Sequence, residues 1–156
     1  FDRVHLTCIA PAELRMPGEI VEHLRARGHT VVESDAMEPS IGHVDIAYST
    51  RIQEERFASK EEANLYRGRY RLNQATYTQY CEPNTVIMHP LPRDSRGEAN
   101  ELDPDLNENP NLAIFRQTDN GVLVRMALFA LVLDVVHLVD RYEAPVSWYT
   151  GKRFGE

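Results

Sequence analysis

Four short apolar runs, separated by spacers long enough to form helices, constrain the fold of this chain more than any other feature. The runs span residues 4–9, 30–33, 44–49 and 85–88. Short strands that alternate with helix-length spacers are typical of a parallel β-sheet with helices on its faces. The runs are almost continuously apolar, as expected of parallel strands, which are buried on both faces. The predicted fold class is therefore α/β, with a parallel sheet flanked by helices.

The spacers carry helix signals of unequal strength. A helix is expected after Pro17 and before Gly28, because apolar residues recur there at helical spacing between a typical start and a typical stop. Weaker helix signals cover residues 37–42, 60–66 and 73–81, and a long polar connection covers residues 93–111.

The most apolar segment lies near the carboxyl end. One strong helix is expected from about Asn120-Gly121, with either residue as its cap, to about Val139. Arg125 interrupts its apolar face and Asp134 closes the apolar run, well short of the roughly 18 apolar residues that a membrane span requires. We therefore expect a buried helix and no membrane association, with Arg125 held by a structural ion pair.

The length and the charge of the chain exclude some classes of protein. The 156 residues are enough for one domain of ordinary size. Seventeen Lys and Arg against 24 Asp and Glu give a formal charge of −7 without a basic cluster, which argues against nucleic-acid binding. The two cysteines are too few for a disulfide framework and fit a reducing, cytoplasmic compartment. The chain opens without an initiator Met or a signal peptide, so we expect a segment to precede it.

The sequence lacks the common cofactor and metal motifs. Its histidines do not form an HExxH or CxxC-type pattern, so no metal site is predicted. No GxGxxG, GxxxxGK[ST] or GxSxG segment occurs, so a dinucleotide site, a P-loop and a serine nucleophile are not indicated. No cofactor is predicted, and catalysis would depend on positioning and on charge stabilisation.

Charged residues follow the third predicted strand, and ligands of open parallel sheets bind beyond the carboxyl ends of the strands. Arg51 offers a planar fork matched to a carboxylate, and Gln53 would point to the same side of an extended chain. Glu55 lies close enough to hold the guanidinium of Arg51 or Arg56. The pattern predicts a site for a small dianion. The alternative is a solvated surface charge network, in which ion pairs are common and weak.

A proline-rich segment, His89-Pro90-Leu91-Pro92-Arg93, follows the fourth predicted strand. Two prolines at alternate positions fix the backbone and remove two amide donors, so the carbonyls are held in a preset direction. Such carbonyls can accept hydrogen bonds from the amide group of a ligand. The alternative is a rigid turn that only leads the chain out of the sheet, with His89 as a structural histidine.

Three separated segments together resemble the aspartate carbamoyltransferase family. They are Thr50–Phe57, His89–Arg93, and Phe115–Gln117 with Asn120-Gly121 and Arg125–Leu128, preceded by Ile9-Ala10-Pro11 and Met16-Pro17. The resemblance covers about residues 4 to 138 and corresponds to the carboxyl-terminal, amino-acid-binding half of that enzyme. It implies a Rossmann-like domain, incomplete at its amino-terminal side. It also implies a transferase that moves a carbamoyl group from carbamoyl phosphate to L-aspartate in pyrimidine biosynthesis.

The resemblance assigns roles to residues by motif. Arg51 would hold a carboxylate of aspartate, with Gln53 beside it and Glu55 orienting Arg51. Leu91 and Pro92 would present backbone carbonyls to the carbamoyl amide of the other substrate. The supporting positions are Arg56, His89 and Arg93. No catalytic residue is expected in this chain, because the family's phosphate-binding motif and catalytic histidine belong to an amino-terminal domain that the chain lacks.

The resemblance also implies a division of the chain and a set of partners. Residues 1–119 would form an aspartate-binding domain without its first βα unit, residues 120–141 a helix that packs on the absent carbamoyl-phosphate domain, and residues 142–156 a tail. The family's catalytic unit is a homotrimer with active sites shared between subunits, and attached regulatory chains stay an open question. The chain alone is therefore predicted to be inactive and poorly stable.

Two other functions stay open at this point. Ornithine carbamoyltransferase shares the fold, but a cysteine follows its strand-end histidine and a Ser-Met-Gly-Gln-Glu segment binds ornithine. Here Pro90 stands in the place of that cysteine, and the cation of Arg51 suits an acidic substrate. The second alternative is a non-catalytic homologue with a role in assembly or regulation.

Overall fold

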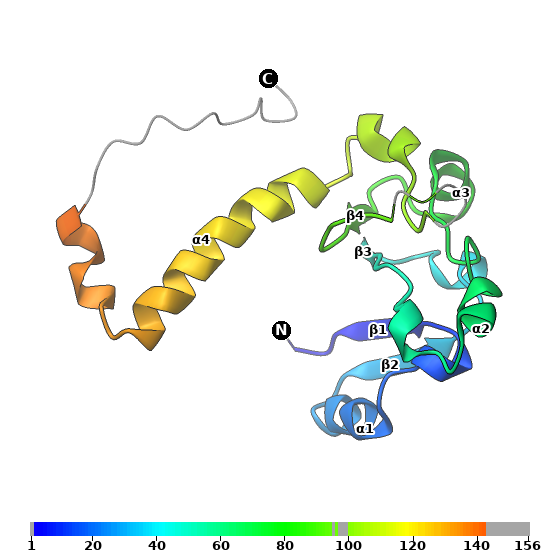
Figure 1. Cartoon of the computed structure of the whole chain (residues 1–156), viewed down its shortest axis with the longest axis horizontal. Coiled ribbons are helices and arrows are strands. Elements are labelled where there is room, and N and C mark those ends of the chain that lie inside the picture. Colours follow the sequence, from blue (N-terminus) through cyan, green and yellow to red (C-terminus); the bar gives the residue numbers. More distant parts are fainter. Residues whose placement is uncertain (1, 95, 97–99, 143–156) are drawn as a thin grey trace.

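Strands and helices alternate along most of the chain, as Figure 1 shows. The structure is a computed structural model that describes residues 2–94, 96 and 100–142. The strands and α-helices are, in order, β1 (His5–Ile9), α1 (Gly18–Ala26), β2 (Thr30–Ser34), β3 (Ile46–Tyr48), α2 (Lys60–Asn64), α3 (Gln74–Tyr80), β4 (Val86–Met88) and α4 (Ile114–Val132). Short 3-10 helices include η1 (Ala12–Leu14), η2 (Glu38–Ser40), η3 (Glu54–Arg56), η5 (Pro104–Glu108) and η6 (Val136–Tyr142).

The four strands form two parallel pairs. In the first pair, β1 lies beside β2 with His5 opposite Thr30, and in the second β3 lies beside β4 with Ile46 opposite Val86. Leu112 adds an isolated parallel bridge to the centre of β4. Each pair is a separate sheet, so among the described residues no strand joins β1 or β2 to β3 or β4. The predicted α/β fold with parallel strands is confirmed.

Local sequence signals account for the ends of the short helices. Helix α1 begins directly after Pro17, and the chain turns after its end at Gly28, where a φ of +85° suits a residue without a Cβ. The Ser59 side chain accepts a hydrogen bond from the backbone of the first turn of α2 at 3.2 Å. Asn73 caps α3 in the same way, at 2.8 Å.

The hydrophobic core lies around the β3–β4 pair. Ile87, at the centre of β4, is completely buried. The main cluster consists of Met37, Ile41, Leu72, Tyr77, Ile87, Leu102, Leu106, Leu112 and Ile114. Two of these leucines lie within residues 93–111, which the sequence predicts only as a polar connection. The segment folds back on the sheet because Leu102 pairs with Leu72 in a parallel bridge and η5 buries Leu106.

The predicted start of the long helix at Asn120-Gly121 is wrong. Helix α4 begins at Ile114, and Gly121 lies in its interior. A Cβ at position 121 would lie 2.9 Å from a guanidinium nitrogen of Arg125, so the glycine leaves room for that side chain. The helix ends at Val132, before the predicted Val139, because Asp134 takes a left-handed φ of 54° and the chain continues as η6.

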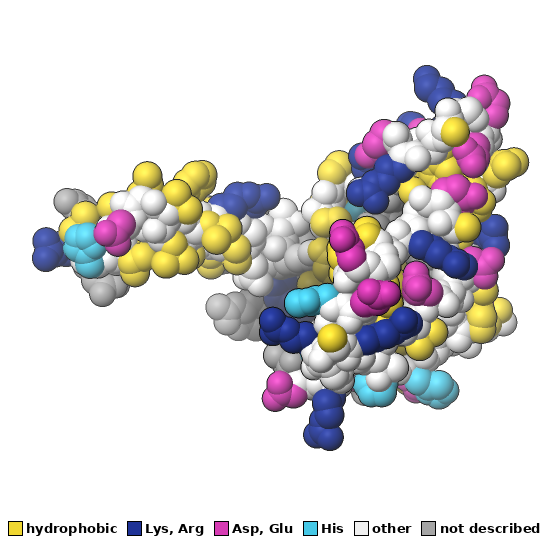
Figure 2. Space-filling view, turned by 90° about the horizontal axis from the view of Figure 1, so that it is seen from below, with side chains coloured by type: hydrophobic (Ala, Val, Ile, Leu, Met, Phe, Trp, Pro, Cys, Tyr) yellow, Lys and Arg dark blue, Asp and Glu magenta, His cyan; other side chains and the backbone are white. Residues whose placement is uncertain are grey.

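The predicted burial of the long helix is also wrong for this chain. Helix α4 projects away from the sheets as an arm, and many apolar side chains are exposed on the face of the arm that Figure 2 shows. Leu123 and Phe129, for example, are 64% and 63% exposed. Arg125 is exposed as well, and no ion pair of Arg125 occurs among the described residues, so the predicted structural pairing is absent there. In the described ranges, no helix has both the length and the apolar character needed to cross a bilayer.

Candidate functional site

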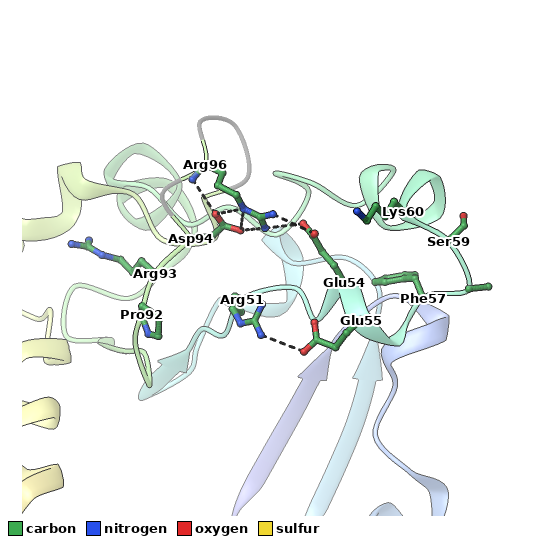
Figure 3. A pocket seen from close by; sticks show the side chains of 11 residues that line it. Arg51, Glu54, Glu55, Phe57, Ser59, Lys60, Pro92, Arg93, Asp94 and Arg96 are labelled. Carbon is green, nitrogen blue, oxygen red and sulfur yellow. Dashed lines mark hydrogen bonds and ion pairs between the residues drawn. The ribbon is translucent and has the colours of Figure 1, made fainter.

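The segments that follow β3 and β4 lie side by side, because parallel neighbouring strands end at the same edge of a sheet. Together they line an open cleft of about 1030 Å³, which Figure 3 shows from close by. The lining residues are Arg51, Glu54, Glu55, Phe57, Ala58, Ser59, Lys60, Pro92, Arg93, Asp94 and Arg96. The structure thus brings the guanidinium of Arg51 and the proline-rich segment to one cavity.

Gln117, on the first turns of α4, fixes the two strand ends relative to each other. Its side-chain oxygen accepts a hydrogen bond from the backbone N–H of His89 at 3.1 Å. Its side-chain nitrogen donates to the hydroxyl of Tyr48 at 2.9 Å. One amide therefore bonds to the end of β3 and to the residue that follows β4.

Arg51 lies on one wall of the cleft, and Glu55 holds it there. Its Nη2 donates to Oε1 of Glu55 at 3.2 Å, and about half of each side chain is exposed. This bond uses one of the five N–H donors of the guanidinium, so the planar fork keeps donors for a ligand. In Figure 3 the Arg51 side chain lies between Glu55 and the segment that carries Pro92.

Lys60 adds a second cation to the same wall, and the sequence did not single it out. Its side chain is exposed and forms no ion pair with another described residue. Counting all lining residues, four cations (Arg51, Lys60, Arg93 and Arg96) face three carboxylates (Glu54, Glu55 and Asp94). A cleft with this charge, in which Arg51 is paired with Glu55 and Lys60 has no ion pair with a described residue, suits a small ligand that carries carboxylates.

Other predicted site residues lie outside this cleft. Gln53 and Arg56 are exposed and do not line it, and the buried His89 does not either. Leu91 lines a smaller neighbouring cavity of about 700 Å³, which shares Pro92 with the cleft. Arg93 lines both cavities and also braces its loop, because its Nη1 donates to Oδ1 of Asn107 at 3.0 Å.

The turn after β4 has an unusual backbone. The Leu91-Pro92 peptide bond is cis, and Leu91 has a φ of +56°, a left-handed value that is rare for a residue with a bulky side chain. The backbone N–H of Leu91 donates to Nδ1 of His89 at 2.8 Å. His89 is only 1% exposed, so it acts on this turn from the interior.

An ion-pair cluster joins the two walls of the cleft. The guanidinium of Arg96 bonds to Asp94 in its own loop and to Oε1 of Glu54 on the opposite wall at 2.8 Å. Arg67 reaches the same oxygen at 3.3 Å. Sequence reasoning missed this cluster, because Glu54 and Arg96 are 42 residues apart and no local pattern links them.

The cluster changes the acidity of its carboxyl groups. The hydrogen bond from Arg96 is the largest cause that lowers the pKa of Asp94, from its ordinary value of 3.8 to about 2. The same side chain lowers the pKa of Glu54. Because the folded pKa of Asp94 is depressed, its stabilising contribution is present above about pH 4 and is lost as the pH falls through about 2.

We expect the substitution Arg96→Ala to raise the pKa of Asp94 from about 2 toward 3.8, since the hydrogen bond that stabilises the carboxylate is removed. A carbon-13 NMR titration of the Asp94 carboxyl group measures this shift. Arg67→Ala is the matched control and should leave the midpoint near 2, because Arg67 contributes least to the shift. A midpoint near 3.8 in the parent protein would contradict the ion pair.

No metal site accompanies the cleft in the part of the chain that the structure describes, since no three His, Cys, Asp or Glu side chains gather there in a suitable arrangement. The cleft offers cations on one wall and, on the other, a backbone turn held by a hydrogen bond to His89. This arrangement can bind and orient an anionic ligand, and positioning of that kind contributes to catalysis without a covalent intermediate.

The sequence matches one protein family over most of its length. The profile described as "Aspartate/ornithine carbamoyltransferase, Asp/Orn binding domain" matches residues 3–132. An aspartate carbamoyltransferase catalytic subunit from Saccharophagus degradans is 69% identical over 154 residues, which make up 99% of this chain and 46% of that protein. The corresponding subunit from Cellvibrio japonicus is 71% identical over 153 residues, or 98% of this chain and 45% of that protein. The chain thus spans about half the length of these relatives.

Solved structures share the fold. The catalytic subunit of M. jannaschii aspartate transcarbamoylase superposes with a TM-score of 0.70 and 32% identity, covering 86% of this chain and 42% of that chain. The Trypanosoma cruzi aspartate transcarbamoylase in complex with N-(phosphonacetyl)-L-aspartic acid gives a TM-score of 0.67 and 26% identity, covering 81% and 39%. Sequence and fold therefore agree with the resemblance noted from the motifs: the chain belongs to the aspartate/ornithine carbamoyltransferase family and corresponds to its Asp/Orn binding domain.

Proposed function

We propose that this chain forms the amino-acid-binding side of an active site that transfers a carbamoyl group from carbamoyl phosphate to the amine of L-aspartate. The products are N-carbamoyl-L-aspartate and phosphate, which places the reaction in pyrimidine biosynthesis. The observation that carries the proposal is the position of Arg51 in one cleft with the turn at Pro92 (Figure 3). The names of the two relatives near 70% identity support the choice of reaction.

In this proposal Arg51 holds a carboxylate of aspartate. A guanidinium presents parallel N–H groups to the two oxygens of a carboxylate, which fixes both the distance and the plane of the ligand. Glu55, 3.2 Å from Nη2, keeps the fork in place before the substrate arrives. Gln53 and Arg56 reach the substrate only if their exposed side chains turn toward the cleft, since neither lines it here.

The turn after β4 holds the other substrate. The backbone carbonyls of Leu91 and Pro92 accept hydrogen bonds from the NH₂ of the carbamoyl group, which leaves the carbamoyl carbon open to attack. The amine nitrogen of aspartate forms a C–N bond to that carbon, the C–O bond to phosphate breaks, and the amine proton is transferred to the departing phosphate. Cations that stabilise the departing phosphate belong, in this proposal, to a separate carbamoyl-phosphate domain.

The arrangement of the chain fits a role as one part of a larger protein. In this proposal residues 1–119 form an aspartate-binding domain, and the apolar helix α4, which crosses the boundary at residue 120, packs on the carbamoyl-phosphate domain. A strand of the polypeptide outside this chain completes the sheet between the two parallel pairs. The complete protein is a homotrimer with shared active sites, and the chain alone is inactive. The proposed tail, residues 142–156, falls almost entirely outside the described residues.

An assay with a polypeptide of the relatives' full length that contains this segment tests the proposal. Carbamoyl phosphate is offered with aspartate, ornithine or other amino acids, and the carbamoylated product is identified by mass. We expect N-carbamoyl-L-aspartate, because a cationic cleft attracts a dicarboxylate and repels the ammonium of ornithine. Carbamoylation of ornithine without that of aspartate would contradict the assignment, and absence of any product would favour the non-catalytic alternative.

A further inference from the structure

A buried carboxylate, Glu101, holds both ends of the turn that follows β4. Its side chain is 4% exposed and does not line the cleft. Its Oε1 lies 2.6 Å from Nε2 of His89, at the start of the turn. Both of its oxygens accept from the backbone N–H of Asp94, at 3.1 and 3.2 Å, where the turn ends. Residues 89 and 94 are therefore fixed by one side chain.

The hydrogen bonds also define the state of the His89 ring. Its Nδ1 accepts from the N–H of Leu91 at 2.8 Å, so the proton of the neutral ring is assigned to Nε2, which donates to Glu101. A continuous chain of hydrogen bonds thus runs from the Glu101 carboxylate through the His89 ring to the backbone N–H of Leu91. The Leu91 bond holds a residue at a φ of +56°, where an unsupported leucine would rarely stay.

The surroundings of Glu101 favour its charged form. Burial alone would raise the pKa of Glu101, but hydrogen bonds from His89 and from backbone N–H groups outweigh burial and lower it. The group is therefore a carboxylate at neutral pH, with both oxygens available as acceptors. A fully satisfied network in a low-dielectric interior is rigid, which is what a backbone turn needs if its carbonyls must keep one direction.

We propose that Glu101 is a positioning residue that acts through His89 to fix the carbonyls of Leu91 and Pro92 in the direction required by the carbamoyl donor. This inference rests on the function proposed above. Glu101 touches no substrate itself, since it lies outside the cleft. Its effect on the reaction is confined to the placement of the turn, on the side where the carbamoyl group binds.

The test compares Glu101→Gln with Asp103→Asn in the full-length polypeptide. The NH₂ of a glutamine at 101 cannot accept a hydrogen bond. At the position of Oε1 it faces both His89 and the Asp94 amide, and at the position of Oε2 it faces the Asp94 amide, so at least one bond of the network is lost. Asp103 is a matched control, because it is a buried carboxylate two residues further on that bonds to Arg71 at 2.7 and 2.6 Å instead of to the turn. Both variants remove one buried charge from the same segment.

We expect Glu101→Gln to lower kcat/KM for carbamoyl phosphate on the order of tenfold to a hundredfold, with the KM for aspartate within about twofold, because a misplaced turn affects one substrate. Asp103→Asn should lower the Tm but leave both kinetic parameters within about twofold of the parent. Unchanged kinetics in Glu101→Gln, or equal kinetic losses in Asp103→Asn, would overturn the inference.

A second variant keeps the test decisive if Glu101→Gln folds poorly. His89→Asn retains an oxygen for the Leu91 N–H but is too short to reach Glu101, so it should show the same kinetic pattern. Where Glu101→Gln is folded, combining the two substitutions should add little, because both interrupt the same chain of hydrogen bonds. If the two losses in kcat/KM were fully additive, the proposal that Glu101 acts through His89 would be overturned.

A structural measurement separates this inference from the proposed function. If the parent protein shows no carbamoyl transfer, the proposed function fails, while crystal structures of the variants still test the turn. We expect Leu91 to leave its left-handed conformation in Glu101→Gln and to keep it in Asp103→Asn. A Leu91 backbone that is the same in both variants would overturn the inference.

Discussion

We expect Arg51→Ala to raise the KM for aspartate by roughly a hundredfold to a thousandfold in the full-length polypeptide, while the KM for carbamoyl phosphate changes little. The side chain provides the paired N–H groups that bind a substrate carboxylate in the proposed site, and loss of a desolvated charged hydrogen-bond pair costs about 3 to 4 kcal/mol. Glu55 would then lose the Arg51 guanidinium that lies 3.2 Å from it, and its carboxylate, no longer paired with that cation, would repel the substrate. Steady-state kinetics with each substrate varied in turn measures the effect.

Arg69→Ala is the matched control for this experiment. Arg69 is also an exposed arginine, but it contacts Asp35 at 3.7 Å and the rings of Tyr66 and Tyr70, outside the cleft. Its removal should leave the KM for aspartate within about twofold of the parent, since surface ion pairs are weak. Unchanged aspartate saturation in Arg51→Ala would remove Arg51 from the binding site.

We expect Phe129→Ala to lower the free energy of unfolding of the full-length polypeptide by about 3 to 5 kcal/mol, the usual cost of deleting a buried phenylalanine side chain. In this chain Phe129 is 63% exposed, so the structure alone would predict a change within about 0.5 kcal/mol. The large loss follows only if α4 packs against the remainder of the protein, as we propose. Denaturant unfolding followed by circular dichroism measures the difference.

Phe57→Ala is the reference for that measurement. Phe57 is 9% exposed and stacks on Tyr66 with ring centroids 5.4 Å apart, so its removal should destabilise the protein whether or not α4 is covered. Comparable losses in both variants would support the docked helix. A destabilised Phe57→Ala beside an unaffected Phe129→Ala would contradict it.

The sequence predicts the elements whose pattern is local. The apolar runs near residues 4–9 and 85–88 became parallel strands, and the Pro17 and Gly28 signals bracket α1 within a residue or two. The prediction failed where a local signal had a different cause. Gly121 suggests a helix boundary, but it lies inside α4, where a Cβ would crowd the Arg125 side chain.

The candidate site was predictable in part, for a similar reason. Parallel topology brings the ends of neighbouring strands together, so the meeting of Arg51 and Pro92 in one cleft follows from the strand pattern. The pair of Glu54 with Arg96 was missed because its two members are 42 residues apart. Glu101 and Lys60 were missed because their roles depend on how the loops fold around the cleft, which no residue pattern indicated. No spacing rule encodes such contacts, and only the folded backbone shows them.

The hydrogen bonds of Gln117 link the geometry of the cleft to the orientation of helix α4. The residue belongs to the rigid first turns of α4, and its amide is bonded both to the backbone of His89 and to the hydroxyl of Tyr48. A tilt of the helix axis would pull on both strand ends at once, since a short amide offers little slack. Any contact that shifts the far end of α4 would therefore also change the distance between the two segments that line the cleft.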